Sequence, residues 1–196
     1  MEHYYSEEQK SPLNIKKIVQ SIRGKDFEFY TASGVFSKNK VDNGTLALAE
    51  SIIIGKNSKV LDVGCGIGIL GIFAAKSFNA DVVMTDINKR AVMLAKKNLE
   101  LNRVKAEIYQ GSLYKNIKEN DFDAVLSNPP QTAGKDVCFE LIEKSKNYLK
   151  ISGTLQIVAR HNKGGKTLAK KMEEVFGNVM VIARKSGYSV YMSIKK

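Results

Sequence analysis

The chain has 196 residues, 43% hydrophobic and 26% charged, a composition typical of one globular domain with a buried core. No apolar run reaches the ~20 residues that span a bilayer, and the start of the chain lacks the pattern of a secretory signal. The two cysteines, Cys65 and Cys138, make neither a disulfide framework nor a zinc motif. We therefore expect a cytoplasmic protein with no membrane partner and no metal site.

Positive charge is in clear excess. Lysine plus arginine number 31 and aspartate plus glutamate 20, which gives a formal net charge of +11. Such an excess favours encounter with a polyanion through long-range attraction, although it can also serve solubility alone. Basic residues gather in the last third of the chain, at Arg160, Lys163, Lys166, Lys170, Lys171, Arg184 and Lys185. We therefore expect a nucleic acid partner.

The elements are irregular at first and then alternate. The first 58 residues predict a helix over 13–22, short strands over 27–30 and 35–37 around Ser33-Gly34, and a helix over 45–53. From residue 59 onward, short apolar runs alternate with helical periodicity. They predict strands over 59–64, 81–86, 106–111, 122–128, 154–159, 178–184 and 188–194, and helices over 69–78, 89–102, 135–149 and 165–176.

This alternation predicts an α/β fold, Rossmann-like, with a doubly wound and mostly parallel seven-stranded sheet. The last two strands flank Ser186-Gly187 and predict an antiparallel edge hairpin. No repeat or linker divides the chain. We therefore expect a single domain over residues 1–196, in which 1–58 form a lid or platform on a catalytic core of 59–196.

The sharpest motif joins the first core strand to the first core helix. It reads Asp62-Val63-Gly64-Cys65-Gly66-Ile67-Gly68. Alternating glycines permit positive φ and let a ligand approach the backbone, at the sheet edge where ligands of this fold class bind. Gly66, Gly68 and Gly71 also match the dinucleotide pattern. However, the Asp62 carboxylate inside the strand suits a ligand with an ammonium and a sulfonium better than a pyrophosphate.

Asp86 ends the second core strand. A carboxylate at this place can accept two hydrogen bonds from a ribose diol. The alternative is an N-cap for the following helix, a role that Asn88 can fill instead. We favour the ribose role for Asp86, and expect Ile87 beside it to pack against an adenine.

This combination resembles the cofactor half of class I methyltransferases. The resemblance implies S-adenosylmethionine as cofactor and S-adenosylhomocysteine as product. In that family the residues after the third core strand often recognise the adenine, which here implies Ser112 and Leu113. The implied cofactor contacts are Asp62, Gly64, Cys65, Gly66, Gly68, Asp86, Ile87, Ser112, Leu113 and Asn128.

The second motif, Asn128-Pro129-Pro130, follows the fourth core strand. Methylating an exocyclic amine requires a nitrogen lone pair that is delocalised into the ring. Two acceptors for the amine hydrogens, the Asn128 side-chain oxygen and the Pro129 carbonyl, would draw that nitrogen toward tetrahedral geometry, and proline helps to aim the carbonyl. Holding the amine in line with the methyl group is the main effect. The alternative is a Pro-Pro turn that merely ends a strand.

The motif resembles that of amino-methyltransferases acting on adenine N6, guanine N2 or glutamine N5. The adenine and glutamine branches usually carry an aromatic residue next, where this chain has Gln131. Guanine N2 is therefore the expected target, with Asn128, Pro129 and Pro130 as catalytic residues.

Further segments, including Ser33–Ser37, Val41–Thr45 and Leu155–Arg160, resemble the small-subunit ribosomal RNA guanine-N2 methyltransferase family and its single-domain archaeal relatives. The resemblance implies that Phe36 and Ser37 line the substrate site and that Asp42 and Thr45 hold the methionine end of the cofactor. Phe36 can instead be a core aromatic, and Asp42 and Thr45 a helix start. We expect Arg160 and Lys163, which follow the fifth core strand, to contact RNA.

We therefore expect an enzyme that methylates the N2 of a guanosine in ribosomal or transfer RNA, at a base that is unpaired or flipped out. Three alternatives stay open. The first is a ring nitrogen of guanine, as in a transfer RNA substrate, and the second is a protein glutamine. The third is an RNA-binding module with a vestigial cofactor pocket.

Overall fold

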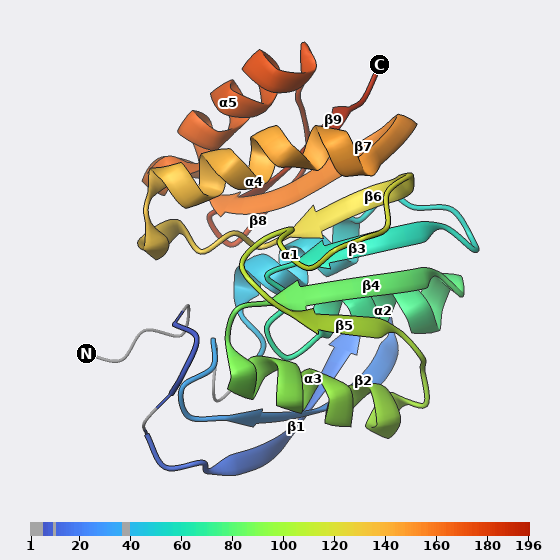
Figure 1. Cartoon of the computed structure of the whole chain (residues 1–196), viewed down its shortest axis with the longest axis vertical. Helices are drawn as coiled ribbons and strands as arrows, with labels where there is room; N and C mark the ends of the chain where they lie inside the picture. The colour runs from blue at the N-terminus through green and yellow to red at the C-terminus, as the bar shows by residue number, and fades with distance from the viewer. Residues whose placement is uncertain (1–5, 10, 37–39) are drawn as a thin grey trace.

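A seven-stranded sheet forms the centre of the structure (Figure 1), a computed structural model that describes residues 6–9, 11–36 and 40–196. The strand order is β5-β4-β3-β6-β7-β9-β8. Neighbours from β5 to β7 pair in parallel, whereas β9 is antiparallel to both β7 and β8. The predicted fold class, a mostly parallel sheet with an antiparallel edge hairpin, is confirmed. The strands are β3 Lys59–Val63, β4 Asp81–Asp86, β5 Glu107–Gln110, β6 Phe122–Ser127, β7 Leu149–Arg160, β8 Met180–Lys185 and β9 Tyr188–Ile194.

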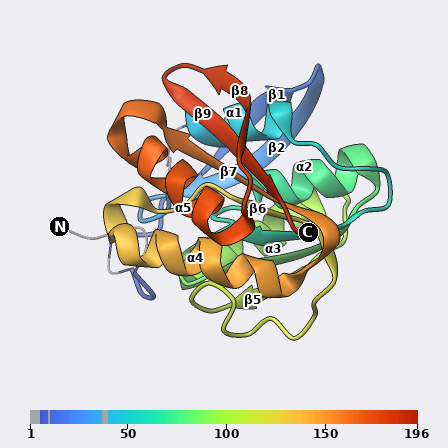
Figure 2. The ribbon, with the colours of Figure 1, turned by 90° about the horizontal axis from the view of Figure 1, so that it is seen from above.

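Helices cover both faces of the sheet (Figure 2). One apolar cluster joins the sheet to α1, α2 and α3, with Leu48, Ile72 and Leu94 at its centre. A second cluster on the other face holds Leu141 of α4 and Met172 of α5. The helices are α1 Asn43–Ser51, α2 Ile69–Phe78, α3 Lys89–Asn102, α4 Lys135–Tyr148 and α5 Lys166–Phe176, with short turns η1 Gln131–Ala133 and η2 His161–Gly165. No helix among the described residues is long and apolar enough to cross a membrane.

The N-terminal hairpin corrects the sequence prediction. The segment expected to form a helix over 13–22 is strand β1, Ile15–Ile22, which pairs with β2, Lys25–Ala32. Ile15, Ile18, Val19 and Ile22 have helical spacing, but β-branched residues favour strands. Arg23 and Gly24, both at positive φ, form the two-residue turn that closes such a hairpin.

Two neighbouring predictions also need correction. The strand expected over 35–37 is absent from its described part, because Val35 and Phe36 lie in a bend and a turn; Ser37 is outside the described residues. The helix expected over 45–53 begins two residues earlier. Asp42 caps it by accepting a hydrogen bond from the Thr45 backbone nitrogen at 2.8 Å.

Two asparagines on α3 hold the hairpin in place. Asn98 accepts from the Tyr30 backbone nitrogen at 2.6 Å and donates to the Tyr30 carbonyl at 3.0 Å. Asn102, one helical turn later, does the same for Glu28, at 3.4 and 2.7 Å. The two carboxamides therefore replace a neighbouring strand along the β2 edge and satisfy its backbone groups. This pairing docks the hairpin on α3 (Figure 1).

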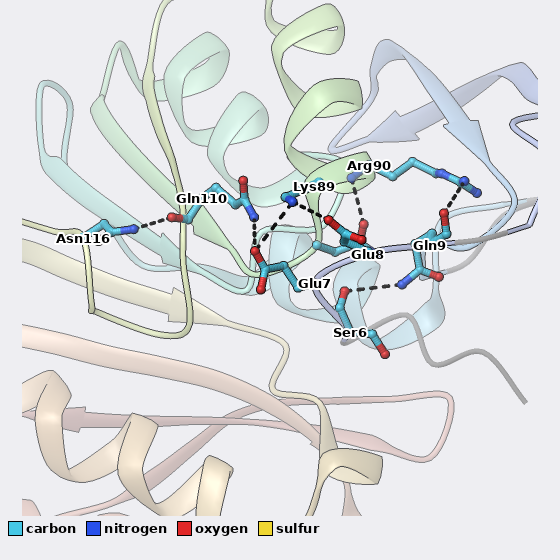
Figure 3. A network of polar contacts seen from close by, with 9 residues as sticks. Ser6, Glu7, Glu8, Gln9, Lys89, Arg90, Gln110 and Asn116 are labelled. Atoms are coloured by element: carbon cyan, nitrogen blue, oxygen red, sulfur yellow. Dashed lines mark hydrogen bonds and ion pairs between the residues drawn. The ribbon is translucent and has the colours of Figure 1, made fainter.

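Residues 6–9 lie beside Lys89 and Arg90 at the start of α3 (Figure 3). The Lys89 backbone nitrogen donates to the Glu7 carbonyl at 3.1 Å. The Arg90 guanidinium donates to the carbonyls of Gln9, Ser11 and Ser33, at 3.2, 2.7 and 2.7 Å. One arginine on α3 thus ties the chain before β1 to the chain after β2.

Candidate active site

A cavity of about 300 Å³ opens at the carboxyl ends of β3, β4, β5 and β6. This is the point where the strand order reverses, between β3 and β6, and where ligands bind in doubly wound sheets. Most of the residues predicted from the sequence line it: Phe36, Thr45, Asp62, Gly64, Cys65, Gly66, Asp86, Ile87, Ser112, Leu113, Asn128, Pro129 and Pro130.

Three of the predicted residues do not line this cavity. Gly68 lies behind it, at φ 90° where the chain turns into α2. Arg160 and Lys163 lie exposed at and beyond the end of β7. The η2 loop that carries Lys163 nevertheless borders the segment after Asn128, because a Cβ on Gly164 would lie 3.8 Å from the Gln131 side-chain oxygen.

The glycine loop forms the floor of the cavity. Gly64 and Gly66 have φ of 70° and 56°, and a Cβ added to either would meet no protein atom within 4 Å. These glycines are therefore needed for their backbone conformation and leave open space in front of the loop. Gly71, which completes the dinucleotide-like pattern, serves packing instead, since its Cβ would lie 2.5 Å from the Met84 sulfur.

Asp62 is the most unusual polar group at the cavity wall. Its side chain is fully buried, and Oδ2 accepts from the Gly71 backbone nitrogen at 3.0 Å. Oδ1 has no hydrogen-bond partner among the described residues. Burial raises the pKa of Asp62 to about 7. An unpartnered carboxylate oxygen at a cavity wall fits a cationic ligand, as the sulfonium and ammonium of S-adenosylmethionine require.

Asp86 joins two loops. Its Oδ2 accepts from the Gly66 backbone nitrogen at 2.7 Å and its Oδ1 from the Asn88 backbone nitrogen at 2.8 Å. The α3 cap is Asn88, which accepts from the backbone nitrogens of Arg90 and Ala91. Burial raises the pKa of Asp86. Each carboxylate oxygen has further acceptor capacity, so Asp86 can receive a diol while it fixes the loops.

Asn128 is held by two side chains of the α1 N-terminus. Its Nδ2 donates to Asp42 Oδ2 at 2.8 Å and to Thr45 Oγ1 at 2.9 Å. Because a carboxylate only accepts, Asn128 must present its amide nitrogen to Asp42. Both amide hydrogens then have partners, and Oδ1 stays available as an acceptor at the cavity wall.

The two prolines shape the turn after Asn128. Pro130 has φ −74° and ψ 79°, and the Gln131 backbone nitrogen donates to the Pro129 carbonyl at 2.8 Å. This is an inverse γ-turn. One lone pair of the Pro129 carbonyl is therefore used within the chain, and only the second can receive a substrate hydrogen.

The sequence analysis did not identify the apolar part of the cavity wall or the contact between Asp42 and Asn128. Leu70, Ala91, Val137 and Leu141 add apolar surface to the cavity. Their helical periodicity is the same as that of core residues, so nothing in the sequence separates them from the core. The contact between Asp42 and Asn128 spans 86 residues and has no local signal.

The family model for the methyltransferase small domain matches residues 26–192. Because that range covers most of the chain, the chain belongs to this family. The prediction of a class I, S-adenosylmethionine-dependent methyltransferase is confirmed at this level, and the dinucleotide alternative is set aside.

Individual relatives agree with this assignment. The chain is 39% identical to the uncharacterized protein YbxB of Bacillus subtilis, over 99% of this chain and 98% of that protein. It is 34% identical to ribosomal RNA small subunit methyltransferase C of Haemophilus influenzae, over 91% of this chain and 54% of that protein.

A solved structure of the Thermus thermophilus 16S rRNA N2 G1207 methyltransferase, in complex with AdoMet and guanosine, matches with a TM-score of 0.85 and 26% identity. The match covers 96% of this chain and 52% of that one. The chain thus spans just over half the length of these ribosomal RNA methyltransferases.

Proposed function

We propose that this protein transfers a methyl group from S-adenosylmethionine to the exocyclic N2 of a guanosine in structured RNA. The main support is the orientation of Asn128, a cavity-lining residue whose amide nitrogen is fully used by Asp42 and Thr45 and whose oxygen is left as the acceptor. An acceptor fixed in this way suits an amine target. Its similarity to ribosomal RNA methyltransferases favours ribosomal over transfer RNA as the substrate.

The cofactor would occupy the floor of the cavity. Asp62 would pair with its positive charge, Asp86 would accept from the ribose hydroxyls, and Ile87, Ser112 and Leu113 would surround the adenine. When bound, S-adenosylmethionine supplies an electrophilic methyl group and leaves as S-adenosylhomocysteine. Gly64 and Gly66 leave the space in front of the loop that such a ligand needs.

The substrate end would work by positioning. Asn128 Oδ1 and the second lone pair of the Pro129 carbonyl accept the two amine hydrogens and draw the nitrogen lone pair out of the ring. The amine is then held in line for transfer. Methylation makes the nitrogen strongly acidic, so its proton passes to water without a dedicated base.

RNA would approach from the side of Phe36 and the β7 end. Phe36 lines the cavity and is 38% exposed, which allows it to stack on a flipped base. Arg160 and Lys163 would hold the backbone of the RNA. In this proposal residues 1–58 form the platform of a single methyltransferase domain, and the α3 contacts of the hairpin hold that platform in place.

The test is to incubate the purified protein with tritiated S-adenosylmethionine and separate pools of unmodified ribosomal and transfer RNA. Chromatography then identifies the labelled nucleosides. We expect label in N2-methylguanosine from ribosomal RNA, and far less with the Asn128→Ala variant. Label in another nucleoside would refute guanine N2 as the target, and label in protein alone would refute the RNA substrate.

A further inference from the structure

A series of side chains leads from the exposed end of β7 to the cavity. Arg160 and Tyr188 are partners in the register of β7 and β9. Arg160 Nε donates to the Tyr188 hydroxyl at 3.1 Å, and the guanidinium lies 5.3 Å from the centre of the Tyr188 ring. The Tyr188 hydroxyl in turn donates to Asp42 Oδ1 at 3.2 Å. Asp42 is the same carboxylate that holds Asn128.

The donor order along this series is fixed by chemistry. An arginine side chain only donates, so the Tyr188 oxygen accepts from Arg160 and its single hydrogen is directed to Asp42. Asp42 only accepts, so Asn128 must direct its amide nitrogen to Asp42. Each step therefore determines the next, and the last one leaves Asn128 Oδ1 available to the substrate.

Tyr188 and Asn128 bind different oxygens of the Asp42 carboxylate. Asp42 Oδ1 accepts from Tyr188, while Oδ2 accepts from Asn128 and from the Thr45 backbone nitrogen. Without the Tyr188 hydroxyl, Oδ1 loses its partner and the carboxylate gains freedom to rotate. The Asp42 acceptor of the Asn128 amide is then held by the Thr45 groups alone.

Gly44 shows that the position of the Tyr188 ring is built into α1. A Cβ on Gly44 would lie 2.7 and 2.9 Å from two Tyr188 ring carbons. Glycine is a poor helix former, and here the close approach of the ring explains its presence. Tyr188 is thus held by α1 on one side and by Arg160 on the other.

We propose that Tyr188 is a positioning residue that acts on Asn128 through Asp42, and that Arg160 acts through Tyr188 in addition to any RNA contact. This inference rests on the proposed function, in which Asn128 is the acceptor for the target amine. It assigns the C-terminal hairpin a part in orienting the substrate amine.

The first test is Tyr188→Phe, which keeps the ring and removes the hydroxyl. We expect kcat to fall about 10-fold, as expected for the loss of one hydrogen bond to a charged group. The KM for RNA and the Kd for the cofactor should stay within about twofold of the wild-type values, and Tm within about one degree. Tyr109→Phe is the matched control, because the Tyr109 hydroxyl also donates to a carboxylate, Glu107, at the far edge of the sheet; its kcat should be unchanged.

A double-mutant cycle separates positioning from general packing. If Tyr188 acts through Asn128, adding Tyr188→Phe to Asn128→Ala should cause no further loss, so the double variant keeps the residual activity of Asn128→Ala. Gly44→Ala removes no hydrogen-bonding group, but its Cβ would lie within 3.0 Å of both the Tyr188 ring and Asp42 Oδ2, so it should lower kcat at least as much as Tyr188→Phe. Additive losses in the cycle, or a wild-type kcat for Tyr188→Phe, would overturn the proposal.

A substrate-free measurement keeps this proposal distinct from the proposed function. The side-chain ¹⁵N–¹H signals of Asn128 are identified by their absence in Asn128→Ala. We expect slow exchange of these hydrogens with water in the wild type and at least about 10-fold faster exchange in Tyr188→Phe. Equal exchange rates would refute the Tyr188 role whatever base is methylated. Faster exchange in a protein that does not methylate guanine N2 would refute the proposed function alone.

Discussion

The two ends of the cavity are built in different ways. The proposed cofactor end consists of loops that follow consecutive strands, and its key groups lie within short motifs such as Asp62–Gly68. The proposed substrate end is assembled by side chains from distant segments, since Asn128 contacts Asp42 and Thr45 across 86 and 83 residues. A local motif can therefore identify the cofactor end, whereas the substrate end depends on the completed fold.

The largest effect should come from the substrate end. Asn128→Ala removes the oriented acceptor, and we expect kcat to fall about 1000-fold, the upper range for loss of one preorganised catalytic hydrogen-bonding group. The Kd for S-adenosylmethionine should change less than about threefold. Single-turnover methylation and isothermal titration measure the two quantities. A similar loss in both would mean that the two ends are not separable.

Asp62→Asn tests whether the carboxylate at the cofactor end contributes to binding of S-adenosylmethionine. Removing the carboxylate should weaken S-adenosylmethionine binding about 100-fold, because a buried charge-assisted contact is lost. In the wild type, affinity should rise about 10-fold from pH 6 to pH 8 as Asp62 ionises around its pKa of about 7. The variant should lack this dependence. A pH-independent wild-type affinity would show that Asp62 does not meet the cofactor's charge.

Asp62 should also make the unfolding free energy of the ligand-free protein depend on pH. The folded-state pKa of Asp62 is raised from 3.8 to about 7, so its stabilising contribution is present below pH 4 and is lost as pH rises through 7. Relative to Asp62→Asn, the wild type should lose up to about 4 kcal/mol of unfolding free energy between pH 4 and pH 8. Denaturant titrations of both proteins at each pH measure this difference. Parallel curves would contradict the buried ionisation of Asp62.

The contrast between the two ends also explains what the sequence could predict. Glycines at positive φ and a carboxylate at a strand end are local requirements, so Gly64, Gly66 and Asp86 were found at the cavity as expected. The β1 strand was mistaken for a helix because its isoleucines have helical spacing. The Arg23-Gly24 turn and the carboxamides of Asn98 and Asn102, some 70 residues away, distinguish the hairpin.

The N-terminal hairpin, β1 and β2, allows a test of whether it is coupled to the cofactor end of the cavity. Asn98 is fully buried and, besides its bonds to Tyr30, donates to the Ile67 carbonyl of the glycine loop at 2.9 Å. Asn98→Ala should lower the unfolding free energy by about 3 kcal/mol and weaken cofactor binding about fivefold. Asn102→Ala is the matched control, since Asn102 holds the hairpin without touching the loop. A wild-type cofactor affinity in Asn98→Ala would show that the hairpin is not coupled to the cofactor end.

Thr45 stands between the two ends and gives the smallest expected effect. The family resemblance implies that Thr45 contacts the methionine end of the cofactor. In the structure, however, its hydroxyl accepts a hydrogen bond from Asn128 and donates one to Asp42 Oδ2 at 3.2 Å. Thr45→Val removes the hydroxyl at nearly constant volume, and Thr45→Ser keeps it as the matched control. We expect Thr45→Val to lower kcat about fivefold with the cofactor Kd unchanged, because the second amide hydrogen of Asn128 loses its acceptor. A raised Kd with normal kcat would assign Thr45 to the cofactor end instead.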